Sequence, residues 1–168
     1  MKRRNQLGRV LVLVLVALIG IAVSSESKQP SIEGTYKLVS RKLPDGTVKT
    51  APDVIGLMTF TQTHRNFNVA WKDDQGKPMS FALIASYSLT DSSYTETVLY
   101  SLTNIEGSGK GATYSFGSQA KSAPVTVEGG KVRFMLPNEP IPIEAVFEGD
   151  KGTATSAGAF IDFWEKIK

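Results

Sequence analysis

The stretch SYSLTDSSYTETVLYS, residues 86–101, decides the fold, because large and small side chains alternate on both sides of a turn. With the turn at residues 91–92, a hairpin brings together four cross-strand pairs: Leu89 with Tyr94, Tyr87 with Glu96, Ala85 with Val98, and Leu83 with Tyr100. Only this register puts the large residues of both strands on one face, since a slip of one residue would move one set to the other face. The stretch therefore predicts an antiparallel β-hairpin with one apolar face.

Glu96 is the exception in that apolar face, where it stands between Tyr94 and Val98. An unpaired buried carboxylate costs several kcal/mol or takes up a proton. We therefore expect the phenol of Tyr87, directly opposite, to hydrogen-bond the Glu96 carboxylate. Three interpretations remain open: a structural bond, a polar anchor for a ligand inside a cavity, or an exposed side chain on a misassigned face.

The rest of the chain from residue 32 also alternates with the period of a β-strand. We expect strands at 33–42, 57–63, 67–72, 81–89, 125–127, 132–134, 143–147 and 160–167. The second and third of these would form a hairpin with its tip at 64–66, in which Met58 faces Trp71 and Phe60 faces Val69. Gly129 and Gly130 predict a tight hairpin turn.

Many short strands joined by short turns predict an all-β fold, an antiparallel up-and-down β-barrel of roughly eight to ten strands, because closure removes exposed sheet edges. A β-sandwich is the alternative, but the hairpins follow one another as in a meander. If the first and last strands pair, Tyr36 and Trp164 should be buried, and Lys166 should lie near an aromatic face.

The N-terminal segment has the pattern of a secretory signal. Four basic residues within the first nine precede an apolar run, Val10 to Val23, which is shorter than the ~20 residues that span a bilayer. Small residues follow, so we expect cleavage between Ala22 and Glu26, and a periplasmic or secreted protein. An uncleaved anchor is the alternative. The predicted organisation is a signal segment at 1–25, a tether at 26–31 and one barrel domain at 32–168.

The charge of the chain points away from nucleic acid. The full sequence has a net charge of +3, but removing residues 1–25 leaves 15 Lys and Arg against 16 Asp and Glu. No stripe of Lys and Arg interleaves with aromatic residues, so we expect no nucleic-acid partner, and no membrane contact after signal removal. There is no cysteine, so an exported domain would depend on its core alone.

Candidate site residues come from the alternating aromatic faces. We expect no metal site, because His64 is the only histidine, no cofactor, and no catalytic residue. The interior-facing residues predicted to line a ligand cavity are Phe60, Phe67, Trp71, Phe81, Tyr87, Glu96, Tyr100 and Phe134. A narrow barrel would fill itself with such side chains, whereas a wider one would hold a small hydrophobic ligand.

Several segments resemble small exported bacterial lipocalin-like proteins of unknown function: IEGTYKLVS (32–40), TQTH (61–64), SYSLTDSSYTETVLYS (86–101) and FWEKIK (163–168). The likeness runs in order along nearly the whole mature chain. Tyr36 stands where the family usually has Trp, and Ala85-Ser86 where Gly is frequent. The resemblance implies a lipocalin-like barrel with a possible small-molecule cavity, and it supplies no activity.

Three functional hypotheses follow. The first is an exported, non-enzymatic barrel that binds a small apolar ligand in its interior. The second is a hydrolase or isomerase that uses Glu96 and His64 at the barrel mouth, which requires the two side chains to meet. The third is a solid-cored interaction or inhibitor module of the cell envelope.

Overall fold

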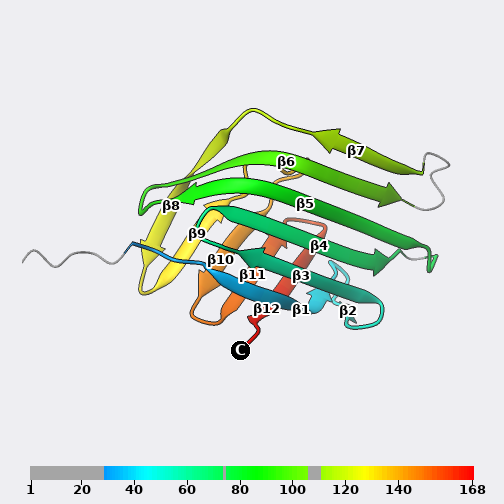
Figure 1. Ribbon diagram of the computed structural model, residues 1–168. Helices are drawn as coiled ribbons and strands as arrows, with labels where there is room; N and C mark the ends of the chain where they lie inside the picture. The colour runs from blue at the N-terminus through cyan, green and yellow to red at the C-terminus, as the bar shows by residue number, and fades with distance from the viewer. Residues whose placement is uncertain (1–28, 74, 106–110) are drawn as a thin grey trace, which may run out of the picture.

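A computed structural model describes residues 29–73, 75–105 and 111–168. These residues form twelve β-strands and no helix (Figure 1). The strands are β1 (Gly34–Lys42), β2 (Val48–Lys49), β3 (Val54–Phe60), β4 (His64–Lys72), β5 (Pro78–Leu89), β6 (Ser93–Ile105), β7 (Ala112–Phe116), β8 (Lys121–Glu128), β9 (Lys131–Met135), β10 (Glu144–Glu148), β11 (Lys151–Ser156) and β12 (Phe160–Lys166).

Ten of the strands close into an antiparallel barrel, which confirms the predicted fold class. The order around the barrel is β1, β3, β4, β5, β6, β8, β9, β10, β11 and β12, and β12 pairs with β1 to complete the circle. The short β2 is added to β1, and β7 is added to β6. In Figure 1, β7 lies at the top of the view, on the far side of β6 from β5.

The β5–β6 hairpin has the predicted register near its turn. Tyr87 lies opposite Glu96, and Ala85 lies opposite Val98. A β-bulge between Ile84 and Ala85 then shifts the pairing, so Ile84 rather than Leu83 lies opposite Tyr100. The fourth predicted pair is therefore wrong, because the extra residue of a bulge reverses which side chains share a face.

The β3–β4 hairpin corrects a second prediction. Its turn lies at 61–63 and not at 64–66, since Phe60 pairs with Arg65 and Met58 with Phe67. Trp71 lies opposite Val54. The hydroxyl of Thr61 accepts a bond from the His64 backbone N–H, which closes the turn three residues earlier than predicted.

Strands β7 and β11 were not predicted from the sequence. All five residues of β7 are exposed, so no apolar alternation marks it. In β11 the inward residues are small: Gly152 leaves room for the Phe147 ring, which would lie only 3.2 Å from a Cβ atom at that position. The Gly129–Gly130 hairpin is confirmed, with Val125 opposite Phe134.

Closure of the barrel buries the expected aromatic residues. Leu38 pairs with Trp164 across the β1–β12 junction, and the Tyr36 and Trp164 side chains are 1% and 2% exposed. The Lys166 ammonium lies 5.6 Å from the centre of the Tyr36 ring. All three expectations for this junction are confirmed.

One end of the barrel is filled by aromatic rings, here called the aromatic floor. Its members touch in a chain of edge-on and stacked contacts: Tyr36, Phe60, Tyr87, Tyr94, Phe134 and Phe147. Such pairs add ~0.5–1.5 kcal/mol each beyond the burial of their area. The floor closes the end at which β3, β5 and β10 finish, and leaves the interior toward the other end less completely filled.

The predicted signal segment, residues 1–25, lies outside the described residues. Within residues 29–73, 75–105 and 111–168, the structure contains no helix with the length and apolarity to cross a membrane.

Candidate ligand-binding cavity

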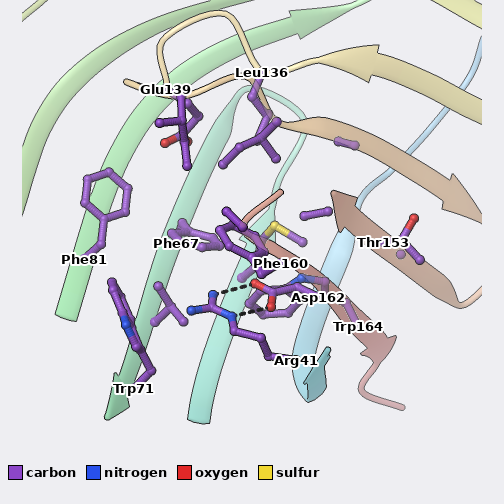
Figure 2. Close-up of a pocket in the computed structure, with 18 of the residues that line it drawn as sticks. Arg41, Phe67, Trp71, Phe81, Leu136, Glu139, Thr153, Phe160, Asp162 and Trp164 are labelled. Atoms are coloured by element: carbon purple, nitrogen blue, oxygen red, sulfur yellow. Dashed lines mark hydrogen bonds and ion pairs between the residues drawn. The ribbon is translucent and has the colours of Figure 1, made fainter. Parts of the chain in front are cut away.

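A cavity of about 360 Å³ lies inside the barrel above the aromatic floor and is partly open to solvent. Phe67, Trp71, Phe81 and Phe160 project into it from β4, β5 and β12, and Leu136 and Glu139 approach from the β9–β10 connection (Figure 2). Most of the remaining lining is aliphatic or aromatic. A largely apolar wall with a few polar groups is typical of small-molecule pockets.

The structure divides the predicted lining residues into two groups. Phe60, Phe67, Trp71 and Phe81 line the cavity. The other four do not: Tyr87 and Phe134 belong to the aromatic floor, Glu96 lies behind Arg65, and Tyr100 lies on the outside of the barrel.

Tyr100 faces outward because of the bulge in β6, where Leu99 has no partner on β5. Its ring contacts Phe116 and Tyr114 on β7, and these two side chains are 77% and 61% exposed. Together with Ile84, which pairs with Tyr100, they form an apolar outer patch, here called the β7 patch. This surface is separate from the interior cavity.

Glu96 is 1% exposed, which excludes the exposed interpretation, and it is the counter-ion of a buried arginine. Arg65 Nη1 donates to Glu96 Oε2 at 3.0 Å, and the Tyr94 hydroxyl donates to the same oxygen at 2.6 Å. Arg65 Nη2 reaches Glu139 Oε1 at 3.4 Å. We call these four residues the Arg65 cluster.

The prediction of a hydrogen bond between Tyr87 and Glu96 is wrong. The Tyr87 hydroxyl donates to the backbone oxygen of Thr61 at 2.5 Å, across the barrel rim. Burial raises the pKa of Tyr87 to about 12. The Glu96 carboxylate instead accepts a hydrogen bond from the hydroxyl of Tyr94, which lies two residues earlier on the same face of β6.

Electrostatics in the Arg65 cluster follow from its burial. Burial alone would lower the pKa of Arg65, but Glu96, Tyr94 and Glu139 outweigh it and raise the pKa above the ordinary value. The guanidinium is therefore charged at any physiological pH. Burial raises the pKa of Tyr94 and that of Glu139, and Arg65 only partly offsets the rise for Glu139.

The cluster holds the β9–β10 connection against the barrel wall. β6 pairs with β8 only over Ser93–Glu96, and beyond this point the two strands separate. The Asn138 amide donates to the freed carbonyl of Glu96 at 2.9 Å, one residue before Glu139 reaches Arg65. Residues 136–143 thereby cover the gap, and five of them line the cavity.

A second buried ion pair lies at the other side of the cavity. Arg41 Nε and Nη2 donate to the two carboxylate oxygens of Asp162 at 2.6 and 2.8 Å. The guanidinium carbon also lies 4.3 Å from the centre of the Phe160 ring and 5.1 Å from that of Trp71 (Figure 2). Burial raises the pKa of Asp162 although Arg41 opposes the rise.

His64 and Glu96 do not form a pair. His64 is exposed, and its Nδ1 lies 2.8 Å from the Thr63 hydroxyl. It pairs in register with Ser86, and the next residue, Arg65, is the one that turns inward to Glu96. Over the residues that the structure describes, no three His, Asp or Glu side chains are placed to hold a metal ion.

Sequence reasoning missed both buried arginines. Arg65 was placed in a turn, although Arg65, Phe67, Val69 and Trp71 alternate with polar or small residues and so share one face of a strand. Arg41 turns inward because the β1–β12 register shifts between Leu38 and Ser40. No local pattern in the sequence indicates this shift. Asp162 could have been found, since it stands two residues before Trp164 on the same face.

No family model matches this sequence, and no curated protein matches it significantly.

Proposed function

We propose that this protein is a non-enzymatic, lipocalin-like binding barrel that holds a small apolar ligand in its interior cavity. The observation that carries the proposal is the cavity itself. Its volume of about 360 Å³ falls within the ~300–1,000 Å³ typical of ligand pockets. A solid-cored interaction module would not need such a space.

The chemistry of the lining favours binding over catalysis. Among the described residues, the titratable side chains along the cavity contact one another, Arg41 with Asp162 and Arg65 with Glu139. A general acid or base must reach the proton that it moves, and Asp162 is held by two short bonds to Arg41 instead. The rival acid–base mechanism needed His64, which lies outside.

The N-terminal sequence supports placing this barrel in the periplasm or outside the cell. The proposal rests on the basic start, the short apolar run and the small residues behind it, together with the resemblance to exported lipocalin-like proteins. N-terminal sequencing of the protein from the cell-envelope fraction tests it: a mature chain should start between Val23 and Glu26. An intact Met1 in the membrane pellet would support an anchor.

Intrinsic fluorescence offers a direct test of ligand binding. The chain has two tryptophans, Trp71 and Trp164, and both line the cavity. The neutral apolar dye N-phenyl-1-naphthylamine, bound inside the barrel, should therefore quench the fluorescence of both tryptophans by energy transfer. The fluorescence of the dye itself should increase. Ala154→Phe, which adds a ring to the half-buried cavity wall, should weaken this signal at least about tenfold by occupying the space.

The matched control is the same exchange at exposed Ala120, which lies away from the cavity and should leave binding unchanged. Thermal unfolding of both variants checks that each is folded. Equal dye binding by the two folded variants would place the dye on the surface and overturn the proposal.

A further inference from the structure

The charges around the cavity do not balance. Among the residues that the structure describes, two arginines, Arg41 and Arg65, face three carboxylates: Asp162, Glu96 and Glu139. With all five ionised, the net charge is −1. Since interactions inside a cavity are screened less than at a surface, this excess bears directly on which ligand is accepted.

The excess charge belongs to Glu139. Arg41 and Asp162 compensate each other through two short bonds. Glu96 receives both the 3.0 Å bond from Arg65 and the 2.6 Å bond from Tyr94, whereas Glu139 receives from Arg65 only a 3.4 Å contact. Glu139 is therefore the least compensated carboxylate of the three.

Glu139 is also the member of the Arg65 cluster best placed to meet a ligand. It lines the cavity, as Arg65 does, and its side chain keeps 9% of its surface exposed, whereas the Arg65 side chain keeps 1%. In Figure 2 it points down from the β9–β10 connection toward the space beside Phe67 and Phe81. A bound cation at this place would complete the charge balance.

The alternative anchor for a charged ligand is Arg41, which would favour a carboxylate. Its charge is already matched by Asp162, and its faces lie against Phe160 and Trp71. An anionic headgroup would enter a wall that is already negative. The two arginines therefore do not make this an anion site.

Resting on the proposed function, we propose that the cavity selects apolar amines: the ammonium pairs with Glu139, and the hydrocarbon body lies among Phe67, Phe81, Trp71 and Phe160. Neutral analogues bind more weakly, because they leave Glu139 with only its 3.4 Å contact to Arg65 in a largely apolar wall. Carboxylates bind weakest, because they add a like charge beside it.

The test uses three probes with the same chain and different headgroups, namely octylamine, octanol and octanoate. Each is titrated at neutral pH against the complex of N-phenyl-1-naphthylamine with the purified full chain. We expect octylamine to displace the dye at a concentration about tenfold lower than octanol, and octanoate to be the weakest. In Glu139→Gln, octylamine and octanol should differ by less than about threefold.

Glu144→Gln is the matched control, because Glu144 follows the same connection but pairs outside the cavity with exposed Arg133. It should keep the full preference for octylamine. Equal displacement by octylamine and octanol, strongest displacement by octanoate, or a preference that persists in Glu139→Gln would each overturn the proposal.

The two proposals fail in different ways. If octanol displaces the dye without any preference for octylamine, interior binding stands and the selection of amines is wrong. If the dye itself does not bind, both are wrong.

Discussion

At the scale of single residues, the most consequential feature is a buried arginine that two carboxylates share. Arg65 and Glu96 are each 1% exposed, so neither charge has water to solvate it. Arg65 Nε and Glu96 Oε1 have no hydrogen-bond partner within the described structure. A buried pair of this kind contributes little net stability, but removal of one member leaves the other uncompensated.

Glu96→Ala should therefore destabilise the protein strongly, by ~3–5 kcal/mol, because Arg65 keeps only its long contact to Glu139. Glu96→Gln should cost less, about 1–3 kcal/mol, since the amide oxygen can still accept from Tyr94 and Arg65. Denaturant unfolding measures both. A cost below about 0.5 kcal/mol for Glu96→Ala, as at a surface site, would contradict the burial.

Glu139 should make the protein less stable as the pH rises. Burial raises its pKa in the folded state above the ordinary 4.5 of the unfolded chain. At a pH between these two pKa values, the folded chain keeps a proton that the unfolded chain has lost. The contribution of Glu139 to stability is then fully present below pH 4.5 and is lost as the pH rises through its raised pKa. Asp162, whose pKa is also raised, adds a slope of the same sign.

Unfolding free energies measured against pH should therefore show a shallower decline in Glu139→Gln than in the wild-type protein. The slope should not vanish, because Asp162 remains. Glu144→Gln, which changes a half-buried carboxylate at the start of β10, directly after that connection, should reproduce the wild-type slope. An unchanged slope in Glu139→Gln would show that Glu139 ionises in the folded state as it does in the unfolded chain.

At the scale of elements, a glycine in the middle of β3 lets the last strand close the barrel. A Cβ atom on Gly56 would lie 2.8 Å from the Trp164 ring and 3.2 Å from Leu38 Cβ and from the Asn68 backbone oxygen. The Trp164 ring of β12 therefore packs directly onto the bare backbone of Gly56. Gly56 has no positive φ, so the close approach is the reason for glycine here.

Gly56→Ala should destabilise the barrel by about 1–3 kcal/mol, because the ring and the backbone must shift to admit one methyl group. Ordinarily the same exchange in a strand would be neutral or favourable, since alanine lowers the entropy of the unfolded chain. A Gly56→Ala protein as stable as the wild type in denaturant would show that Trp164 does not lie over β3.

The elements that sequence alone predicted are those whose faces differ strongly. β5 and β6 alternate large and small residues, which defined their hairpin, and the Gly129–Gly130 turn needs no tertiary information. The bulge at Leu99 in β6 could not be predicted, because the alternation of residues 94–100 continues through it in the sequence without a break. As a consequence of the bulge, Tyr100 was wrongly predicted to face the interior. The turn before β4 was also predicted in the wrong place, so Arg65 was not recognised as an inward-facing residue and as the partner of Glu96.

At the scale of the whole molecule, the barrel has a filled end and a hollow end. The aromatic floor is packed by rings in mutual contact, whereas the space between β4, β5, β12 and the β9–β10 connection is not filled by side chains. This asymmetry could not be derived from alternation, because inward-facing residues look the same in a solid and in a hollow barrel. The difference between the two ends depends on which aromatic rings reach the barrel axis.

A second apolar surface, the β7 patch on the outside of the barrel, could compete with the cavity for a hydrophobic probe. Tyr114 and Phe116 are strongly exposed there, so a hydrophobic probe has a second place to bind. Probe binding in solution, taken alone, does not separate the two surfaces. The position of the probe does.

A crystal structure of the protein grown with N-phenyl-1-naphthylamine tests the central claim most directly. Interior binding predicts density for the dye inside the barrel, between Trp71, Phe81 and Phe160, with the Arg41–Asp162 ion pair intact beside it. Density on the β7 patch, with the interior closed by its own side chains, would contradict the account.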